Sequence, residues 1–302
     1  MFAHRVEIDG DDLWTEYCMY IAKGGRLGLM QYPPLKNVYT NEWAEEDGLD
    51  CDLSAPRLDS KEFDIKLNID DREYGQAAVL YDDFVHNVCD GKYHDWYFAD
   101  LQKFFRLRFV SHSNIKIMNQ PKSGYGNLTA QTGMLLSLKF ADDFPLFQYT
   151  YQRPNIEEPF YRRYKSIDSA SKIDSMYFYE YGAVLLEGSL LEVYKTPEMK
   201  TALIQNISSG TGRQMLSQFG THKGKQSKIT LLMTAPNMQD LLRSYYALLW
   251  RITQPDPHTL IVKRGDGELI QHDVYYKSSV VKKFYTENTP SIIFSIIFQV
   301  ID

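Results

Sequence analysis

The sequence of 302 residues is poor in the features that mark secreted or membrane proteins. It has only three cysteines, Cys18, Cys51 and Cys89, which are widely spaced and form no C-x-x-C pair. Isolated cysteines in an odd number are typical of a reducing compartment and argue against a disulfide framework. No apolar run approaches the roughly 20 residues that span a bilayer, and the N-terminal residues show no charged-then-apolar signal pattern. We therefore expect assembly in a cytoplasm, without a membrane partner.

An excess of positive charge is also missing. The formal net charge is −6 at pH 7. A general nucleic-acid binder needs lysines and arginines that displace counterions from phosphates, so the balance argues against that class. A local basic patch remains compatible with it.

Motifs that carry chemistry are scarce. The sequence contains no H-E-x-x-H and no G-x-S-x-G. His86, Cys89 and His94 lie close together, but a tetrahedral metal site would need a fourth ligand from elsewhere. We interpret Cys89 as a small packed hydrophobe and the histidines as residues on or near the surface. We expect no enzyme activity, no cofactor and no metal.

Aromatic residues are abundant: 22 tyrosines and 16 phenylalanines contribute to an aromatic content of 14%. These residues favour the pleated, half-buried surface of sheets. The hydrophobic content of 44% and charged content of 24% are those of a globular chain. The sequence therefore predicts a mainly β protein with flanking helices.

A repeated order of elements is the strongest pattern. The first half predicts a strand at 63–69, a helix at 76–89, β-rich segments at 103–110 and 114–118, and a closing strand at 134–140.

The second half has the same order. It predicts a strand at 228–233, a helix at 238–252, a hairpin from 258–264 and 268–278 around a G-D-G turn, and a closing strand at 290–300. Apolar residues recur through 238–252 at the helical period, which predicts that Leu241, Tyr245, Leu248 and Leu249 face the sheet.

Each predicted core is preceded by another matching pair of segments. Residues 13–25 and 178–194 both read as β-rich with glycine interruptions, and each is followed by a long polar excursion. We expect two tandem modules with superposable folds. The predicted division is 1–150 for the first module, 151–175 for a polar linker, and 176–302 for the second module.

The first excursion mixes acidic and apolar residues over 41–58. Unpaired buried carboxylates are strongly disfavoured, so this segment is too acidic to be buried alone. Its leucines and tryptophan indicate that part of the segment is buried against another surface. We interpret it as an arm that reaches a neighbouring subunit, with solvated loop acids as the alternative. Its candidate contact residues are Trp43, Glu45, Glu46, Asp47, Leu49, Asp50, Asp52 and Leu53.

The second excursion carries basic residues at the equivalent place. This loop is the candidate partner of the acidic arm, through complementary charge. Its residues are Arg213, Lys223, Lys225 and Lys228.

The arm and the order of elements after it resemble bacteriophage tail-tube-type proteins, in the branch of distal tail proteins and baseplate hubs. The resemblance rests on Trp43 and the acidic run 45–48, followed by a D-x-S-x-P-x-L stretch at 52–58 that leads into the first core strand. It is strongest over 40–140 and weaker over 180–302.

The resemblance implies a structural protein of a virion tail or tail-like particle, assembled in the bacterial host cytoplasm. Each module would be a β-sandwich or split barrel with a flanking helix, and long strands would line a ring around passing DNA without binding it specifically. Family rings have sixfold symmetry, which three chains with two modules each or six chains with one module each could provide. Other tail or baseplate proteins would be partners.

One alternative belongs to a different class. Tyr93, Trp96 and Tyr97 read as exposed aromatics, which would suit a non-catalytic carbohydrate-binding β protein.

Overall fold

The structure is a computed structural model that describes residues 5–70, 76–121, 129–146, 149–200, 204–206, 213–215, 220–263, 267–286 and 289–301. The chain forms two antiparallel seven-stranded sheets with long helices against them, so the expected mainly β fold with flanking helices is confirmed. None of the helices in these ranges is long and apolar enough to cross a membrane.

The first sheet belongs to the N-terminal half and has the strand order β2-β1-β7-β8-β9-β6-β3. In chain order, its strands are β1 (Val6–Ile8), β2 (Asp11–Asp12), β3 (Met19–Ile21), β6 (Lys61–Asp70), β7 (Tyr93–Phe98), β8 (Lys103–Pro121) and β9 (Thr129–Asp142). Helix α3 (Ala77–Val88) contacts β6 and β9, while the short helices α1 (Leu13–Tyr17) and α2 (Leu27–Met30) flank β3 in the chain.

The second sheet has the order β11-β10-β16-β17-β18-β15-β12. Its strands are β10 (Lys172–Ile173), β11 (Met176–Tyr177), β12 (Ala183–Leu185), β15 (Gln226–Thr234), β16 (His258–Lys263), β17 (Leu269–Tyr285) and β18 (Ser291–Val300). The helical elements are α4 (Glu158–Ile167), the 3-10 turn η1 (Phe178–Tyr181), α5 (Ser189–Tyr194) and α6 (Met238–Ile252).

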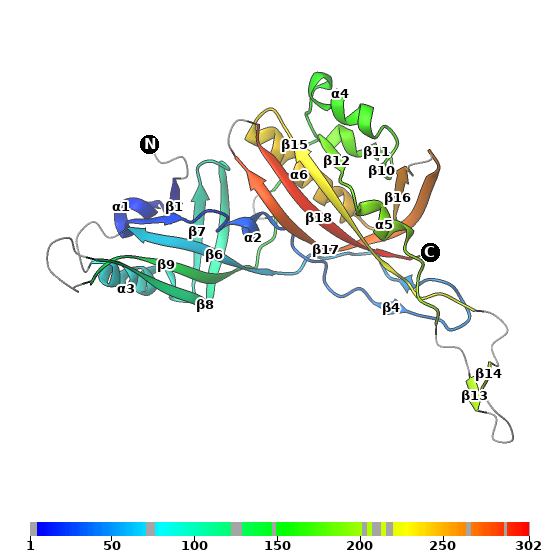
Figure 1. Ribbon diagram of the computed structural model, residues 1–302, viewed down its shortest axis with the longest axis horizontal. Helices are drawn as coiled ribbons and strands as arrows, with labels where there is room; N and C mark the ends of the chain where they lie inside the picture. Colours follow the sequence, from blue (N-terminus) through cyan, green and yellow to red (C-terminus); the bar gives the residue numbers. More distant parts are fainter. Residues whose placement is uncertain are drawn as a thin grey trace.

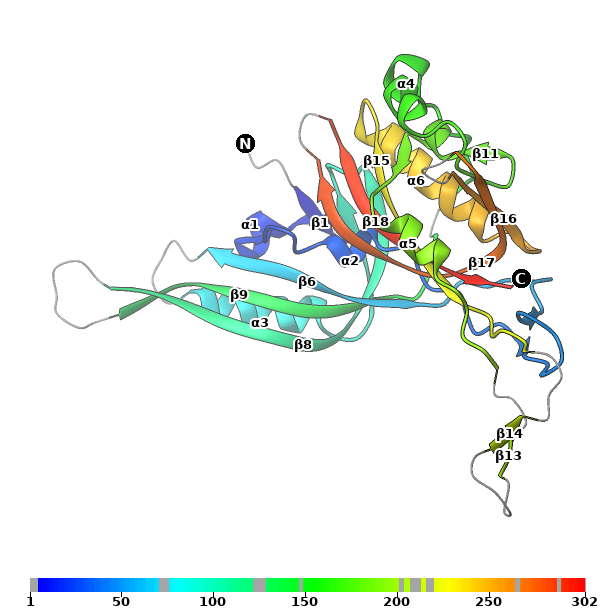
Figure 2. The same ribbon diagram turned by 45° about the vertical axis from the view of Figure 1, so that its right-hand side comes forward.

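The two sheets repeat one plan, element for element. Each module runs through a short hairpin, a helical turn, an edge strand, a short helix, an excursion, a long strand, a long helix and three more strands. Even the excursions match, because each carries a two-stranded hairpin: β4 (Thr40–Asn41) with β5 (Asp50–Cys51), and β13 (Ile204–Asn206) with β14 (Arg213–Met215). Figures 1 and 2 show both modules, with β13–β14 reaching far out beyond the second sheet.

Alternating side chains explain the core strands. Strand β6 buries Phe63, Ile65, Leu67 and Ile69 and exposes or half-exposes the polar residues between them, as a sheet with one covered face requires. Helix α6 buries the four residues expected to face inward, Leu241, Tyr245, Leu248 and Leu249. Asn237 caps its start by accepting a hydrogen bond from the Asp240 amide.

Two of the expected strand regions are wrong. Residues 13–25 and 178–194 are mostly helical turns around three-residue edge strands. Aromatic and β-branched composition suggested strands, but local capping decides the structure. Asp12 accepts from the amides of Trp14 and Thr15, and Glu180 accepts from the Tyr177 amide.

Other boundaries differ in detail. Residues 103–110 and 114–118 belong to one strand, β8. The polar residues between them interrupt the alternation of apolar and polar residues, and β-bulges near Val110 and Ser113 accommodate them within the strand. Strand β17 continues to Tyr285. The range expected as a linker, 151–175, contains α4 and β10. Of the predicted G-D-G turn, Gly265 and Asp266 lie outside the described residues.

Candidate functional site: the junction of the two modules

The first module contacts the second through residues 24–36, which include α2. We name this segment the first clasp. Its backbone runs along β17 of the second sheet. The Leu35 amide donates to the Lys277 carbonyl (2.8 Å), and the Tyr32 amide donates to the Ser279 hydroxyl (2.9 Å). The Tyr276 hydroxyl in turn donates to the Pro33 carbonyl (2.7 Å). The clasp therefore covers part of β17 that β16, paired only as far as Val274, leaves free.

Aromatic side chains fill the space beneath the first clasp. The Tyr32 ring packs 4.1 Å from the Tyr245 ring and 5.6 Å from the Phe294 ring, measured between centroids, and all three are buried. The hydroxyls are satisfied by main chain: Tyr245 donates to the Met30 carbonyl, and Tyr32 donates to the Tyr245 carbonyl. Burial raises the pKa of Tyr32 well above its usual value. Such a packed and satisfied contact fixes the two modules relative to each other.

A buried lysine holds the first clasp from its own module. Lys61 Nζ donates to the carbonyls of Leu29 (2.7 Å) and Gln31 (2.9 Å) and lies 3.7 Å from Asp142. Burial lowers the pKa of Lys61 to about 8, although the nearby carboxylate acts in the opposite direction.

The second module has its own copy of the clasp, residues 188–200, which include α5. Cys18 and Gly182, both left-handed helix caps, occupy equivalent places in the two modules and are 164 positions apart. The same offset makes Lys225 the counterpart of Lys61. Lys225 Nζ donates to the carbonyls of Val193 (2.7 Å) and Lys195 (3.1 Å), the counterparts of Leu29 and Gln31. We name this segment the second clasp.

The acidic arm lies against the second module of its own chain. Lys200 Nζ donates to the carbonyls of Trp43 (2.5 Å) and Glu46 (2.6 Å), and the His222 amide donates to the Asp47 carboxylate (2.7 Å). That hydrogen bond is the main reason why the pKa of Asp47 is lowered.

The apolar residues of the arm divide between docked and exposed. Leu53 is buried and Leu49 is half-buried, with its amide bonded to the Ile301 carbonyl (2.9 Å). Trp43 is 53% exposed and donates to Asp50 (2.7 Å). Glu45, Glu46 and Asp52 are exposed. One face of the arm is therefore docked, and the other is open to solvent.

The predicted basic residues take other positions. The Lys223 backbone bridges to Gly48 of the arm, while its side chain pairs with Glu198 (3.7 Å). Lys225 holds the second clasp, and Lys228 is exposed on β15. Arg213 lies on β14, and its side chain is outside the described part. The side chains that bind the arm are instead Lys200, Thr221 and His222, which sequence reasoning missed.

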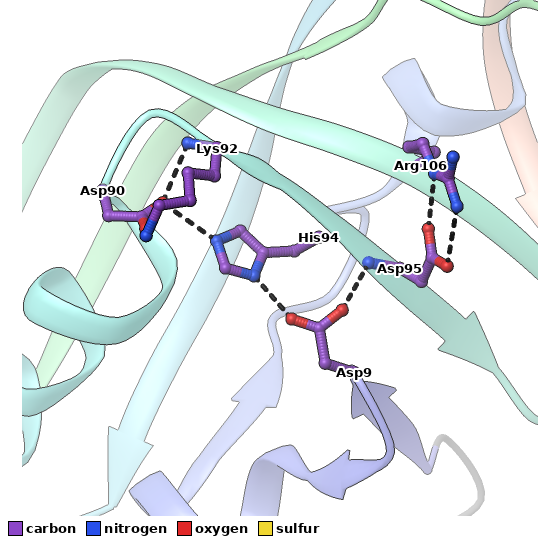
Figure 3. A network of polar contacts seen from close by, with 6 residues as sticks. All are labelled: Asp9, Asp90, Lys92, His94, Asp95 and Arg106. Atoms are coloured by element: carbon purple, nitrogen blue, oxygen red, sulfur yellow. Dashed lines mark hydrogen bonds and ion pairs between the residues drawn. The ribbon is translucent and has the colours of Figure 1, made fainter.

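A histidine–aspartate pair recurs in both modules. In the first, Asp9 binds the ring of His94 (2.6 Å) and the amide of Asp95 (2.8 Å), as Figure 3 shows. In the second, Asp174 binds the ring of His258 (3.0 Å) and the amide of Thr259 (3.0 Å). Both aspartates have left-handed backbones, with φ of 53° and 51°. The pairs fasten the first hairpin of each module to its neighbouring strand.

The interpretation of His94 as a surface residue is wrong. His94 is buried and binds Asp90 as well as Asp9. Burial alone would lower its pKa, but the bonds to the two carboxylates outweigh burial and raise it. Hydrogen bonds from Lys92 hold the pKa of Asp90 far below its usual value (Figure 3). Hydrogen bonds from the Arg106 guanidinium lower the pKa of Asp95. No group of three His, Cys, Asp or Glu side chains in the described ranges is arranged to hold a metal ion.

The expectation that Tyr93, Trp96 and Tyr97 are exposed is wrong for Trp96. Trp96 is fully buried and packs edge-on against Phe140 (5.0 Å between centroids). Inward-facing residues alternate along β7, and Trp96 falls on the inner face. Tyr93 is exposed and bonds to Asp143.

Comparisons with known proteins give little beyond this geometry. No family model matches the chain, and no curated protein matches it. Among solved structures, the chain is similar to the Dit (gp 19.1) protein of SPP1, described as a paradigm of the hub adsorption apparatus in phages that infect Gram-positive bacteria. The match covers 98% of each chain at 10% sequence identity, with a TM-score of 0.33. A likeness at that level assigns no role to this chain.

Proposed function

We propose that this protein is a structural subunit of a bacteriophage tail or phage-like tail particle. It would form a ring at the distal end, as a tube–baseplate connector or hub, with a channel and a docking surface for other tail proteins. Its activity is assembly and not catalysis.

The observation that carries the proposal is the tandem repeat. Two sheets of identical strand order, each with a flanking helix and an outward excursion, stand in one chain. Sheets leave pairing-prone edges that a closed ring of modules can cover. Three chains would supply six modules, which agrees with the sixfold symmetry implied by the resemblance of residues 40–140. DNA would pass through the channel without specific binding, consistent with the net charge of −6.

The arm serves the same purpose in this proposal. Its inner face is docked on the second module, and its outer face presents Trp43 and exposed carboxylates. This outer face would meet a neighbouring subunit or ring. Exposed ion pairs add only about 0–1 kcal/mol each, so apolar contacts would supply most of the affinity.

Solution mass and electron microscopy test the proposal together. We expect a mass three or six times the 35.2 kDa of the chain, and negatively stained particles with a central hole. A stable monomer at all concentrations would contradict it, and a monomer that binds glycan arrays would favour the carbohydrate-binding alternative.

A further inference from the structure

The two clasps have the same sequence plan but different surroundings. Aligned through the structure, GGRLGLMQYPPLK (24–36) and GSLLEVYKTPEMK (188–200) share glycine, leucine, proline and lysine at equivalent positions. Each also pairs internally in the same way: Leu35 bridges to Leu58, and Met199 bridges to His222. The second clasp is therefore built like the first.

The two clasps differ in how far their apolar side chains are covered by the rest of the described chain. Met30 and Tyr32 are 2% and 1% exposed, and the Tyr32 ring packs against Tyr245 and Phe294 of the second module. In the second clasp, apolar side chains face solvent: Leu191 is 73% exposed, Met199 is 53% exposed and Tyr194 is 36% exposed. The Met199 amide, the counterpart of the Leu35 amide, has no backbone acceptor within the described residues.

The surface that receives a clasp is also present twice. In the second sheet it is the part of β17 beyond Val274, where a bulge at Lys277 offers its carbonyl to Leu35. The registers align His94–Leu107 with His258–Val274, so the bulge at Val110 of β8 is the counterpart of Lys277.

Burial again differs between the two copies. Ser279 and Tyr276 of β17 are 0% and 1% exposed beneath the first clasp. Their counterparts on β8 are His112, which is exposed, and Phe109, which is half-buried. Farther along the same strand Ile115 and Ile117 are 41% and 51% exposed. Strand β7 pairs with β8 only as far as Arg108, so this edge of β8 is uncovered among the described elements.

We infer that the second clasp of one chain docks on the β8 edge, around Val110, of a second copy of this chain. The contact would repeat between chains the junction that the first clasp makes within the chain, with the Met199 amide donating to the Val110 carbonyl. It is a head-to-tail contact, and such contacts close into rings when the rotation allows. The inference rests on the proposed ring and specifies the surface that builds it.

Engineered disulfides test the contact directly. Residues joined by a hydrogen bond across neighbouring strands have Cα atoms about 5 Å apart, within the range that a disulfide bridges. The pair Leu35→Cys with Lys277→Cys should link within a chain and keep the monomer mass on a denaturing gel. The pair Met199→Cys with Val110→Cys should link chains into a ladder. The wild-type chain, oxidised in parallel, measures any linkage through its native cysteines.

A charge substitution gives an independent measurement. Leu191→Glu should leave the circular dichroism unchanged, because the side chain is already exposed, and should weaken association about tenfold, equivalent to about 1.4 kcal/mol. The matched control is Ile167→Glu at the end of α4, an apolar side chain that is 61% exposed and lies outside the clasp. It should associate like the wild type.

The outcomes separate this inference from the proposed function. A chain-to-chain ladder together with weakened assembly of Leu191→Glu supports the clasp. Rings that form normally, while Met199→Cys and Val110→Cys stay unlinked or Leu191→Glu associates like Ile167→Glu, overturn the clasp and leave the ring intact. A chain that never leaves the monomer mass overturns both.

Discussion

His94 and His258 have the same structural task in the two modules. Each lies at the start of a strand and is fastened to an aspartate whose left-handed backbone forms the tip of the first hairpin. Aspartate tolerates this conformation better than most residues. The pairs are therefore part of the scaffold, although a lone histidine near carboxylates could be read from sequence as a ligand.

A pH-dependent loss of stability should follow substitution of His94. Its pKa is raised above 6.5 in the folded chain, so the stabilisation by the charged ring is complete below about 6.5 and disappears as pH rises through the folded pKa. We expect His94→Gln to lower the free energy of unfolding by about 1 kcal/mol near pH 5.5 and by less near pH 8.5. Urea unfolding at both pH values measures this.

The control for this substitution is His86→Gln, which changes an exposed histidine in the last turn of α3. It should show a smaller effect at the acidic pH. An equal loss for His94→Gln at both pH values would mean that its charge is not what stabilises the hairpin.

At the scale of elements, the sequence was most informative where periodicity extended over many residues. Helix α6 spans the expected 238–252, and α3 lies within the expected 76–89. The core strands β6 and β15 also fall where alternation predicted them. The short elements were not predicted, because they depend on single helix caps, as at Asp12, and on tertiary pairing, as in the three-residue edge strands.

The junction was harder to foresee than the sheets. No local pattern shows that residues 24–36 lie on β17, because that contact joins segments about 250 positions apart, as the Tyr32–Ser279 hydrogen bond does. One signal was available: the repeated glycine, leucine, proline and lysine of the two clasps.

Helix α6 gives a direct test of core packing. Leu248 is fully buried between helix and sheet, so Leu248→Ala should reduce the free energy of unfolding by about 2–5 kcal/mol. Gln239→Ala, on the exposed face of the same helix, should change it by less than about 1 kcal/mol. Denaturant midpoints for the two variants provide the comparison. Equal midpoints would indicate that α6 is held by something other than its apolar face.

The arm provides the second test at this scale. Deletion of residues 44–56 should leave both sheets folded, since the arm adds no strand to either of them, and should abolish ring formation. Circular dichroism reports the fold, and light scattering reports the assembly. Glu45→Gln with Glu46→Gln is the matched control and should assemble nearly normally, because exposed charges contribute little. An unfolded deletion variant, or persistent rings, would reduce the arm to a solvated loop.

At the scale of the whole molecule, the junction turns two modules into one rigid unit. Tyr32 of the first module lies buried among Tyr245, Tyr276 and Phe294 of the second. A subunit that sets the angle between successive modules in a ring needs such a fixed junction, because an error at each step would prevent closure. In the proposed ring, the intrachain contact would set the geometry that each interchain contact repeats.

Coupled unfolding is the consequence that calorimetry can detect. The wild-type chain should unfold in one cooperative transition, because unfolding of either module would expose the aromatic cluster that the two modules share. Tyr32→Ala removes the ring at the centre of that cluster, at a cost of about 3–5 kcal/mol typical of large aromatic truncations. We expect its thermogram to divide into two transitions, one for each module. Tyr39→Ala, which removes a ring that is 73% exposed, should keep the single transition. Two transitions in the wild type would show that the modules fold independently, and the ring geometry would then depend on contacts between chains instead of on this junction.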